Sequence, residues 1–396
     1  MKPVEILTIK NKLPLWKKEE SANNIELIQL EEVGFEIVSQ KDLYKVGDKA
    51  VYIQPDYCLS EISLFESFLR PNGDITKCKL GSNNRIKAIK FNFHKGDNQV
   101  VYSQGILLPY SEVQQYILSL PKKERGADDT LDSIEDLAKL LQITKWEDPY
   151  EKTGSGLVNG ASSKFPDGMY RTDEENINNV WNHLFHRITY PVTLVGTEKI
   201  DGSSITLWYK DGKSGICSRN LSKPLFSTKI TGRRKKTIFE RVLFWTKPDL
   251  NIYNNVESDS DFVKNGKPYL DKLIGFCSEN KQNLVLRGEL NGQGSKGSGN
   301  KNNPSVKLPQ NIQFYGLDLF KENTIKLGEE EFTNICNTLN LNRCKVVFNK
   351  EFNSKEEILQ ECETYFKRNM VEGIVIRTLD HNFSAKVMNL EYDSKK

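Results

Sequence analysis

A lysine followed by an aspartate and a glycine marks the part of this sequence best suited to covalent chemistry. Lys199, Asp201 and Gly202 lie between two stretches that alternate apolar and polar residues, as β-strands do. The lysine is therefore expected where one strand gives way to the next. A lysine beside a phosphate-binding pocket can lose its proton through neighbouring positive charge and attack as a neutral amine. Alone the pattern is weak, because a surface lysine before a turn has the same appearance.

Further charged residues follow at the ends of predicted strands. Glu289 ends a buried strand over residues 284–290, Glu372 begins another over residues 371–377, and Lys386 comes soon after. Carboxylates hold the divalent cation that neutralises a triphosphate, and a second lysine stabilises charge on the α-phosphate in the transition state. These groups in this order are the parts that covalent transfer of a nucleotide to a lysine requires.

The pattern around these residues predicts a domain of antiparallel strands with flanking helices. The pair at 211–212, Asp-Gly, predicts a hairpin turn after the lysine, because glycine adopts positive φ without strain. Amphipathic helices are predicted over residues 329–339 and 354–368, the second capped by Ser354. A capping box at residues 172–175 predicts a further helix that continues through residue 184.

The first part of the chain has a different pattern. Apolar runs at residues 50–53, 100–102 and 105–109 follow one another without a long helix between them, which is typical of a small β-barrel. Lys87 and Lys90 lie where basic and apolar residues alternate, and they predict a strand face that meets nucleic-acid phosphate. A solvated barrel face is the alternative interpretation.

The composition changes between these two parts. Residues 119–164 hold a polar run, a stretch from Leu131 to Leu141 with helical spacing, and a Gly/Ser-rich segment that suits a flexible joint. We therefore expect a nucleic-acid-binding domain over residues 1–118, a linker with a short helix over 119–164, and a second domain over 165–396.

The overall composition is that of a soluble protein. Of 396 residues, 37% are hydrophobic and 28% charged, and no apolar run is long enough to span a membrane. The start lacks the apolar segment of a signal peptide, and the seven cysteines form no Cys-x-x-Cys pair, so a cytoplasmic protein without a zinc site is expected. The net charge is only +3, but the run at 233–236 is basic. Such a run is most often a solvated loop, and a contact with nucleic acid becomes the better interpretation only if the run flanks a site.

As a set, the motifs resemble those of the covalent nucleotidyltransferases, which include DNA ligases, RNA ligases and capping enzymes. The stretches that resemble motifs I, Ia, III, IIIa, IV and V are residues 199–202, 218–220, 287–290, 314–319, 372–373 and 384–386. Within that superfamily the sequence most resembles the RNA ligases of the Deinococcus/Naegleria type, which carry an OB domain ahead of the ligase domain. Residues 47–52, 103–109 and 165–175 resemble the N-terminal half of that type.

The resemblance implies an α+β fold, in which an N-terminal OB-type β-barrel is joined to a nucleotidyltransferase (ATP-grasp-like ligase) domain of antiparallel sheets flanked by helices. DNA ligases and capping enzymes resemble one another in placing an OB domain after motif V. Here the sequence ends soon after Lys386, so that layout is disfavoured.

The resemblance also implies roles for the matching residues. Lys199 would take AMP from ATP, Asp201 would assist, and Lys386 would hold the α-phosphate. The implied nucleotide-binding residues are Glu198, Gly202, Arg219, Glu289, Phe314, Tyr315 and Glu372. The implied ligands of Mg²⁺ or Mn²⁺ are Asp201, Glu289 and Glu372. Basic residues that flank such a site become candidate contacts with nucleic acid. These are Arg233, Arg234, Lys235, Lys87 and Lys90.

Three positions depart from the family pattern. Met388 stands where a second motif V lysine is common. Leu317, rather than an aromatic residue, precedes Asp318, so Phe314 or Tyr315 would have to stack on the base, and strand alternation puts Phe314 on the side of Asp318. Ser204 occupies a place that some RNA ligases fill with asparagine.

We therefore expect a monomeric, ATP-dependent RNA ligase that joins a 3′-hydroxyl RNA end to a 5′-phosphate end through lysyl-AMP and adenylylated-RNA intermediates, in RNA repair. Two alternatives stay open. One is a GTP-dependent capping enzyme or DNA ligase of unusual layout. The other is a nucleic-acid-binding protein with a catalytically inactive ligase fold.

Overall fold

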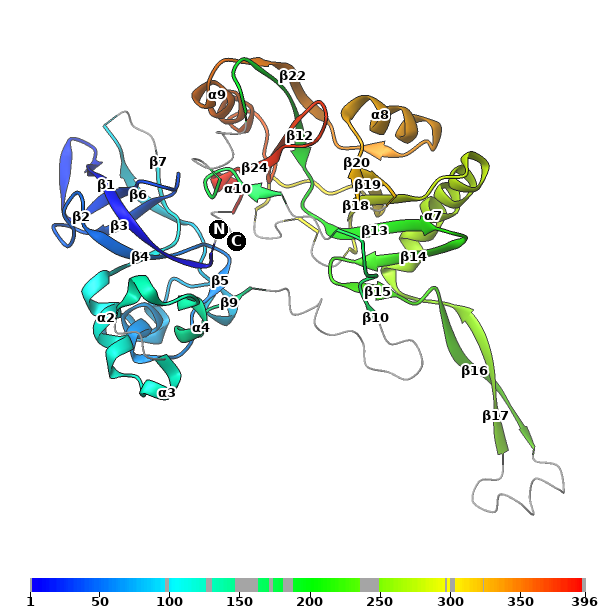
Figure 1. The fold of residues 1–396 in the computed structure, drawn as a ribbon, viewed down its shortest axis with the longest axis horizontal. Coiled ribbons are helices and arrows are strands. Elements are labelled where there is room, and N and C mark those ends of the chain that lie inside the picture. The colour runs from blue at the N-terminus through cyan, green and yellow to red at the C-terminus, as the bar shows by residue number, and fades with distance from the viewer. Residues whose placement is uncertain are drawn as a thin grey trace.

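The structure is a computed structural model that describes residues 2–96, 100–125, 130–146, 163–170, 174–180, 188–235, 249–295, 298–299, 303–322 and 324–393. Figure 1 shows an N-terminal body, in blue and cyan, beside a larger C-terminal body built on two sheets. The fold is a mixed α+β fold dominated by antiparallel strands.

The N-terminal body is built on a seven-stranded sheet with the order β3-β2-β1-β4-β8, in which β6 pairs with both β1 and β7. The long first strand makes this possible, because its first half pairs with β4 and its second half with β2. The strands are β1 (Val4–Lys17), β2 (Glu20–Leu30), β3 (Glu36–Gln40), β4 (Lys49–Ile53), β6 (Ile89–His94), β7 (Val100–Ser103) and β8 (Ile106–Pro109). The strands predicted from the three apolar runs are confirmed.

Short elements cover one side of this sheet. They are β5 (Tyr57–Cys58), α1 (Glu66–Leu69), α2 (Tyr110–Ser119), α3 (Lys122–Arg125), α4 (Leu137–Leu140) and β9 (Thr144–Lys145). The helical spacing after Leu131 yields only a 3-10 turn and the four-residue α4, because Asp136 caps a new helix start by accepting from the amide of Lys139. Leu131, Leu137 and Leu141 are buried in the same core as Val51 of β4. The domain boundaries stay a prediction.

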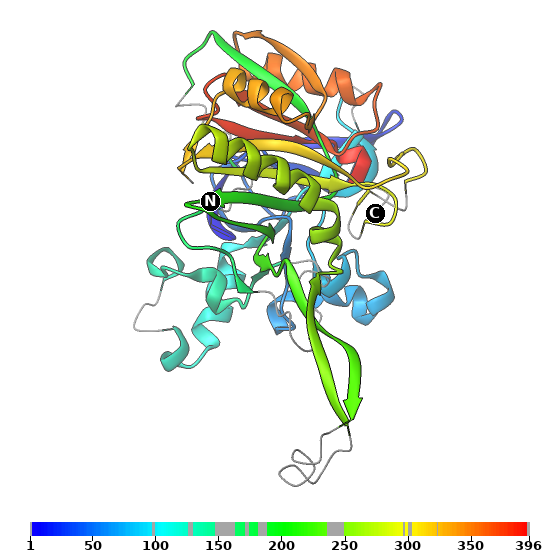
Figure 2. The same ribbon diagram turned by 90° about the vertical axis from the view of Figure 1, so that its right-hand side faces the viewer.

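The C-terminal body contains an eight-stranded sheet with the order β10-β15-β14-β13-β18-β19-β20, to which β21 adds beside β19. Helices α7 and α8 pack on it (Figure 2). The core between them and the sheet is mostly leucine, with isoleucine, phenylalanine and cysteine. The elements are β10 (Ser163–Lys164), β13 (Ser203–Lys210), β14 (Lys213–Ser218), β15 (Leu221–Lys223), α7 (Asp261–Asn280), β18 (Leu284–Asn291), β19 (Gln313–Lys321), β20 (Ile325–Lys326), α8 (Glu329–Thr338) and β21 (Asn342–Arg343).

A five-stranded sheet with the order β11-β24-β23-β12-β22 forms the other half of the C-terminal body, and α9 packs on it. The elements are β11 (Glu175–Asn176), β12 (Val192–Lys199), β22 (Val346–Phe352), α9 (Lys355–Phe366), β23 (Gly373–Thr378), β24 (Ser384–Met388) and α10 (Leu390–Asp393). The chain passes directly from the end of β12 in this sheet to the start of β13 in the other. Lys199 stands at that passage.

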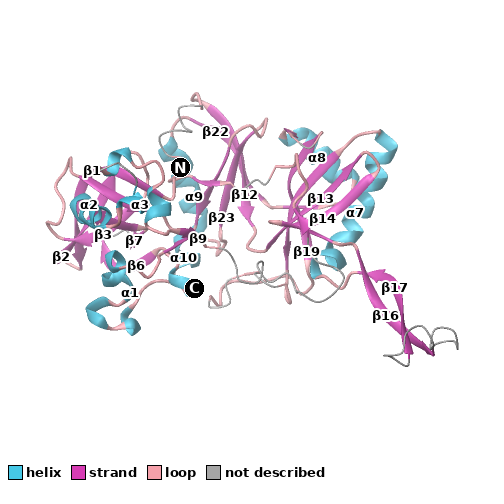
Figure 3. Ribbon diagram, turned by 60° about the horizontal axis from the view of Figure 1, so that its bottom comes forward, coloured by secondary structure: helices cyan, strands magenta, loops and turns pink. Residues whose placement is uncertain are grey.

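A separate two-stranded ribbon, β16 (Phe226–Lys235) and β17 (Asp249–Glu257), extends away from both sheets (Figure 3). The basic residues 233–235 pair with residues 249–251, at the end of the ribbon farthest from its first residue. Residue 236, the last of the predicted basic run, lies outside the described residues.

Most predicted elements of the C-terminal body are confirmed. The hairpin turn has positive φ at both Asp211 and Gly212, and Ser354 caps α9 by accepting from the amide of Glu357. The helix predicted after the capping box does not begin there. Glu175 and Asn176 instead form β11, which pairs with β24, so tertiary pairing outweighs the local signal. Residues 181–187 lie outside the described part of the chain.

The described residues include no helix that is long and apolar enough to cross a membrane. All seven cysteines lie in described segments, and none of them forms a disulfide.

Candidate active site

Lys199 lies against a carboxylate that comes from the neighbouring strand. As the last residue of β12, it pairs in register with Gly373, the first residue of β23. Glu372, the residue before this glycine, accepts a hydrogen bond from Lys199 through its Oε2 atom, 2.5 Å from Nζ. The side chains of Lys199 and Glu372 are 25% and 11% exposed, so the pair lies at the surface of a partly closed site. The structure thus brings together the predicted nucleophile and one predicted acid.

Glu289 reaches the same site from the other sheet. It lies on β18, in register with Ser204 of β13, just beyond the passage between the sheets. Burial raises the pKa of Glu289 to about 8, and although Lys199 lowers it, the Glu372 carboxylate raises it further. Like charges close together disfavour each other's ionised form. The carboxyl group of Glu289 therefore takes up a proton at a higher pH than an ordinary glutamate does.

The electrostatic surroundings of Lys199 differ from those that we predicted. Its burial lowers its pKa, but the carboxylates of Glu372, Glu289 and Asp201 outweigh this effect, so the pKa of Lys199 lies above its ordinary value. The prediction of a lysine made neutral by positive neighbours is therefore wrong for the free protein, because the neighbours that act on it are acids. An ammonium ion in this position has to lose its proton before it can attack.

Two glycines allow neighbouring segments to approach closely at the site. A Cβ atom on Gly202 would lie 2.4 Å from the carbonyl oxygen of Leu290 and 2.8 Å from Cγ of Glu289. A Cβ atom on Gly373 would lie 2.5 Å from the carbonyl oxygen of Val387. Neither position accepts a side chain without moving a strand. Close packing against the neighbouring backbone therefore requires glycine at both positions, each of which directly follows an acid of the site.

Asp201 is held through its side chain and its backbone. Its Oδ2 atom accepts a hydrogen bond of 2.7 Å from the hydroxyl of Tyr392, and its carbonyl oxygen accepts one of 2.8 Å from Nδ2 of Asn291. These contacts join the passage between the sheets to α10 on one side and to β18 on the other.

Glu198 points away from Lys199, because neighbouring residues of a strand face opposite sides. Its carboxylate accepts a hydrogen bond of 2.5 Å from the hydroxyl of Tyr365 on α9 and pairs with Lys345 at 3.4 Å. Its predicted contact with the base stays a prediction, and in the free protein these two groups occupy the carboxylate.

A β-bulge in β19 separates the two predicted aromatic residues. Gly288 pairs with Gly316 and Arg287 with Asp318, so Leu317 is an extra residue that reverses the alternation. The prediction that Phe314 shares the side of Asp318 is therefore wrong. Phe314 is 0% exposed and stacks on Tyr269 of α7 at 5.0 Å between ring centroids, so it is closed to a ligand.

Tyr315 lies on the opposite face of β19 from Phe314. It pairs in register with Glu289 and is only partly buried. Its hydroxyl donates to Oε1 of Gln313 at 3.0 Å, which orients the ring beside the acid. Of the two predicted aromatic residues, Tyr315 is the one that has a face near the site.

A buried ionic network fastens the two sheets together next to Lys199. Asp318 of β19 is 0% exposed and pairs with Arg287 at 3.2 Å, Lys326 at 3.0 Å and Arg377 of β23 at 3.4 Å. Burial alone would raise the pKa of Asp318, but Arg377, Lys326 and Arg287 hold it well below its usual range.

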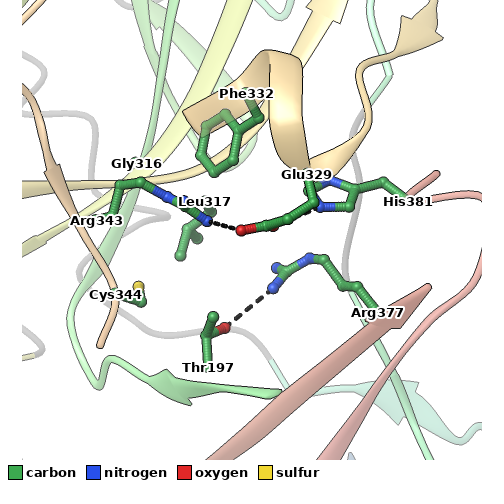
Figure 4. Close-up of a pocket in the computed structure, with 9 residues that line it drawn as sticks. All are labelled: Thr197, Gly316, Leu317, Glu329, Phe332, Arg343, Cys344, Arg377 and His381. Atoms are coloured by element: carbon green, nitrogen blue, oxygen red, sulfur yellow. Dashed lines mark hydrogen bonds and ion pairs between the residues drawn. The ribbon is translucent and has the colours of Figure 1, made fainter. Parts of the chain in front are cut away.

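A small pocket lies beside this network, and Figure 4 shows how its side chains are oriented. Arg377 points to Thr197 of β12 and donates to its hydroxyl at 3.1 Å, while Arg343 pairs with Glu329 at 2.8 Å. The network therefore reaches the strand that carries Lys199, two residues before it.

The predicted metal ligands do not form a finished cage. Among the described residues, no three Asp, Glu, His or Cys side chains are arranged to hold a metal ion by themselves. Asp201, Glu289 and Glu372 act instead on the ammonium of Lys199. Carboxylate oxygens suit Mg²⁺ or Mn²⁺, and Mg²⁺ is commonly bound by one or two carboxylates together with substrate phosphates. The donor set fits a cation that enters with a triphosphate.

Comparison with known proteins decides the family. The family model described as RNA ligase matches residues 192–388, which hold Lys199, Glu289, Glu372 and Lys386. Through these residues the chain belongs to the RNA ligase family. No curated protein sequence matches the chain.

Solved structures share the fold of this RNA ligase family member over its whole length. Naegleria gruberi RNA ligase with PPi is 22% identical, covers 99% of this chain and 98% of its own, and has a TM-score of 0.67. A lysine-to-methionine variant of that ligase with AMP and Mn is 21% identical, covers 100% and 99%, and has a TM-score of 0.68. A lysine-to-alanine variant with ATP and Mn is 21% identical, covers 100% and 98%, and has a TM-score of 0.66.

In this RNA ligase family member, Lys386 and Met388 lie on the site face of β24. Met388 pairs with Gly373, which pairs with Lys199, so the three form a row across the sheet. Lys386 pairs with Val375, one step farther along the same face. The position of the missing second lysine is therefore directly across the glycine from the nucleophile, and an apolar side chain fills it.

The other predicted residues lie outside the strands that carry Lys199 and Glu289. Arg219 is exposed at the bend between β14 and β15. Lys90 of β6 pairs with Glu391 of α10 at 2.6 Å, and Lys87 precedes β6. Their predicted contacts with nucleotide or nucleic acid stay predictions.

Several residues of the site were not predicted. Tyr392, Asn291 and Tyr365 bind the residues on either side of Lys199, and Arg287 and Arg377 neutralise Asp318. Arg287 and Arg377 lie in strands that were predicted, where an arginine in a buried strand signals a buried acid. Tyr392 and Tyr365 have no such signal, because their partners lie far away in the sequence.

Proposed function

We propose that this chain is an ATP-dependent RNA ligase whose nucleophile is Lys199. The observation that carries the proposal is the position of the Lys199 amine, 2.5 Å from Glu372 at the passage between two sheets, within a stretch that belongs to the RNA ligase family. Structures of a ligase with the same fold hold ATP, AMP, PPi and Mn, which supports ATP as the nucleotide and a divalent cation as its companion.

The first step forms a phosphoramide. The Lys199 amine attacks the α-phosphorus of ATP, so that a P–N bond forms while the P–O bond to pyrophosphate breaks. Oε2 of Glu372, which already accepts a hydrogen bond from Nζ, is placed to receive the proton that the amine has to lose. Lys386 would meet the α-phosphate from the same sheet face. Glu372 or Glu289 would hold a divalent cation, whose positive charge would favour the loss of that proton and the departure of pyrophosphate.

The next two steps join the RNA. An oxygen of an RNA 5′-phosphate attacks the phosphorus of lysyl-AMP, so that a P–O bond forms and the P–N bond to Lys199 breaks. A 3′-hydroxyl then loses its proton to water and attacks the phosphorus of the 5′-phosphate, so that a new P–O bond forms while the P–O bond to AMP breaks and AMP leaves. The sum is a phosphodiester bond made at the expense of ATP, which is the chemistry of RNA repair. We propose that the ligase acts as a monomer.

We infer that the N-terminal body is an OB-type domain that holds RNA near the break. Its seven-stranded sheet, with a long first strand shared between two partners, supports this assignment. The division into residues 1–118, 119–164 and 165–396 belongs to the same proposal. The packing of Leu131, Leu137 and Leu141 into the N-terminal core favours a joint that begins after them.

Labelling with nucleotide tests the proposed function. Protein stripped of bound AMP with pyrophosphate is incubated with Mg²⁺ or Mn²⁺ and ATP or GTP that carries label in the α-phosphate. Covalent label from ATP is expected, because the amine of Lys199 retains the α-phosphate and the nucleoside. Label from GTP alone would indicate a capping enzyme instead. No label under any condition would indicate a nucleic-acid-binding protein with an inactive ligase fold.

The β16–β17 ribbon gives a prediction for RNA binding. Replacing Arg233, Arg234 and Lys235 together by alanine is expected to weaken RNA binding at low salt, because a basic ribbon that extends from the domain meets phosphate. The slope of log affinity against log salt should fall by about 2, since each phosphate contact with a single strand adds about 0.7. Filter binding over a range of salt concentrations measures both quantities.

The matched control for the ribbon replaces three exposed lysines elsewhere on the C-terminal body, Lys264, Lys281 and Lys321. This variant carries the same loss of charge but leaves the ribbon intact. Equal slopes for the two triple variants would show that only net charge matters, and the ribbon would lose its assigned role.

A further inference from the structure

The short helix α10 touches both acidic segments of the site. The amide of Asn389, which directly precedes α10, donates to the carbonyl oxygen of Glu372 at 2.9 Å, and its side-chain Nδ2 donates to Val371 at 2.9 Å. Tyr392, three residues later, donates its hydroxyl to Oδ2 of Asp201 at 2.7 Å. The segment 389–393, which is α10 with the residue before it, therefore contacts the chain at Glu372 and at Asp201.

Tyr392 is placed to fix the orientation of the Asp201 carboxylate. It is 2% exposed, so its ring is held by packing and its hydroxyl has little freedom to move. A hydrogen bond from a buried hydroxyl to a charged carboxylate is stronger than one between neutral groups. Asp201 in turn acts on the ammonium of Lys199. Tyr392 thus reaches the nucleophile through one intermediate side chain.

Glu391, the residue before Tyr392, contacts the N-terminal body. Oε2 of Glu391 accepts from Nζ of Lys90 on β6 at 2.6 Å and from the hydroxyl of Tyr102 on β7 at 2.7 Å. Lys90 and Tyr102 are paired neighbours on adjacent strands, so they present one docking point. Figures 1 and 3 show α10 between the N-terminal body and the C-terminal sheets.

We propose that α10 couples the N-terminal sheet to the active site, with Tyr392 as a positioning residue for Asp201 and Glu391 as the anchor that Lys90 and Tyr102 hold. This inference rests on the proposed function. It gives Lys90 a role in the first step of the reaction, in which no RNA takes part, besides the predicted contact with nucleic acid. The two roles are separable, because a contact with RNA cannot change a step that lacks RNA.

The test measures the rate of lysyl-AMP formation without RNA, at a series of ATP concentrations. Tyr392→Phe is expected to lower the maximal rate about tenfold, the effect of losing a hydrogen bond to a charged group. The ATP concentration for half-maximal rate should change less than twofold, because Tyr392 orients Asp201 and makes no contact with the nucleotide. A loss of folded protein would lower the labelled fraction and leave the rate constant unchanged.

The anchor is tested by Glu391→Gln and Lys90→Met. Each is expected to lower the same rate about threefold, the range for partly exposed ion pairs, and the double variant should be no slower than either one. Tyr209→Phe and Lys49→Met are the matched controls. Tyr209 accepts a hydrogen bond from Ser278, and Lys49 pairs with Asp132, so both lose a comparable contact away from α10.

Five outcomes decide the matter. The expected losses in Tyr392→Phe, Glu391→Gln and Lys90→Met, with unchanged controls, support the coupling. Anchor variants at the wild-type rate would overturn the coupling, and Tyr392→Phe at the wild-type rate would overturn the positioning role, while labelled wild-type protein keeps the proposed function intact. Equal losses in controls and variants would also overturn the inference. Wild-type protein that takes no label would overturn the proposed function, and this inference with it.

Discussion

Alanine in place of Lys199 is expected to abolish covalent labelling by ATP, with a loss of about 10⁴-fold or more, because the group that forms the P–N bond is absent. The Lys199 amine is held by its hydrogen bond to Glu372, and the charges of three carboxylates act on it. A water molecule that fills the space left by the side chain cannot form the P–N bond. Denaturing gels of protein labelled with ATP measure the loss. Lys213→Ala, at an exposed lysine of the same domain, should label as the wild type does.

The Lys199→Ala variant should remain folded. Removing the ammonium leaves acids facing one another, but the pKa of Glu289 is already about 8, and Lys199 is one of the charges that lower it. Without Lys199 the pKa of Glu289 rises further, so Glu289 is protonated at neutral pH and repulsion is relieved. Unchanged thermal unfolding together with lost label is the expected pair of results. Full labelling of the variant would assign the nucleophile to another residue.

Asparagine in place of Asp318 is expected to lower the free energy of unfolding by about 3–5 kcal/mol, the range for breaking a buried ion pair by removing one partner. Asp318 is fully buried, and Arg287, Arg377 and Lys326 lie within 3.4 Å of it. The neutral amide removes the carboxylate that compensates these cations in the interior, and Arg377 keeps its contact of 3.3 Å with Glu174. Urea unfolding measures the effect. Asp271→Asn, which removes an exposed partner of Lys267 on α7, should change stability by less than about 1 kcal/mol.

The same variant has a defined pH dependence. The pKa of Asp318 is lower in the folded protein than in the unfolded chain, where it is about 3.9. Its stabilising contribution is therefore fully present above about pH 5 and is lost as the pH falls below about 4 toward the folded pKa. The difference in stability between the wild type and Asp318→Asn should narrow in acid. A difference that is as large at pH 3 as at pH 7 would contradict the assignment.

The parts of the site that could be predicted from the sequence are those in which the chemistry and the strand pattern coincide. Lys199, Glu289 and Glu372 each lie at or near a strand end, and the structure brings them together as the order of the motifs indicated. The glycines beside Lys199 and Glu372 carry information of the same kind, because the close approach of strands forbids a Cβ there.

What could not be predicted depends on contacts between distant residues. The bulge at Leu317 moves Phe314 into the core, and strand alternation gives no sign of it. The capping box at residues 172–175 is a sound local signal, yet pairing of Glu175 with Ala385 prevails. The contact between Tyr392 and Asp201 joins residues 191 positions apart, so neither residue's neighbours in the sequence reveal it.

The nucleophile Lys199 lies at the connection between the two sheets of the C-terminal body. Lys199 and Glu372 belong to the five-stranded sheet, whereas Gly202 and Glu289 are held by the eight-stranded sheet, and only residues 200–202 connect β12 to β13. A change in the angle between the sheets would therefore carry Glu289 away from Lys199 and leave the Lys199–Glu372 pair intact. Asp318 and Arg377 hold that angle, because each comes from a different sheet. The grouping of acids around Lys199 therefore depends on the angle between the two sheets, and neither sheet carries the whole group by itself.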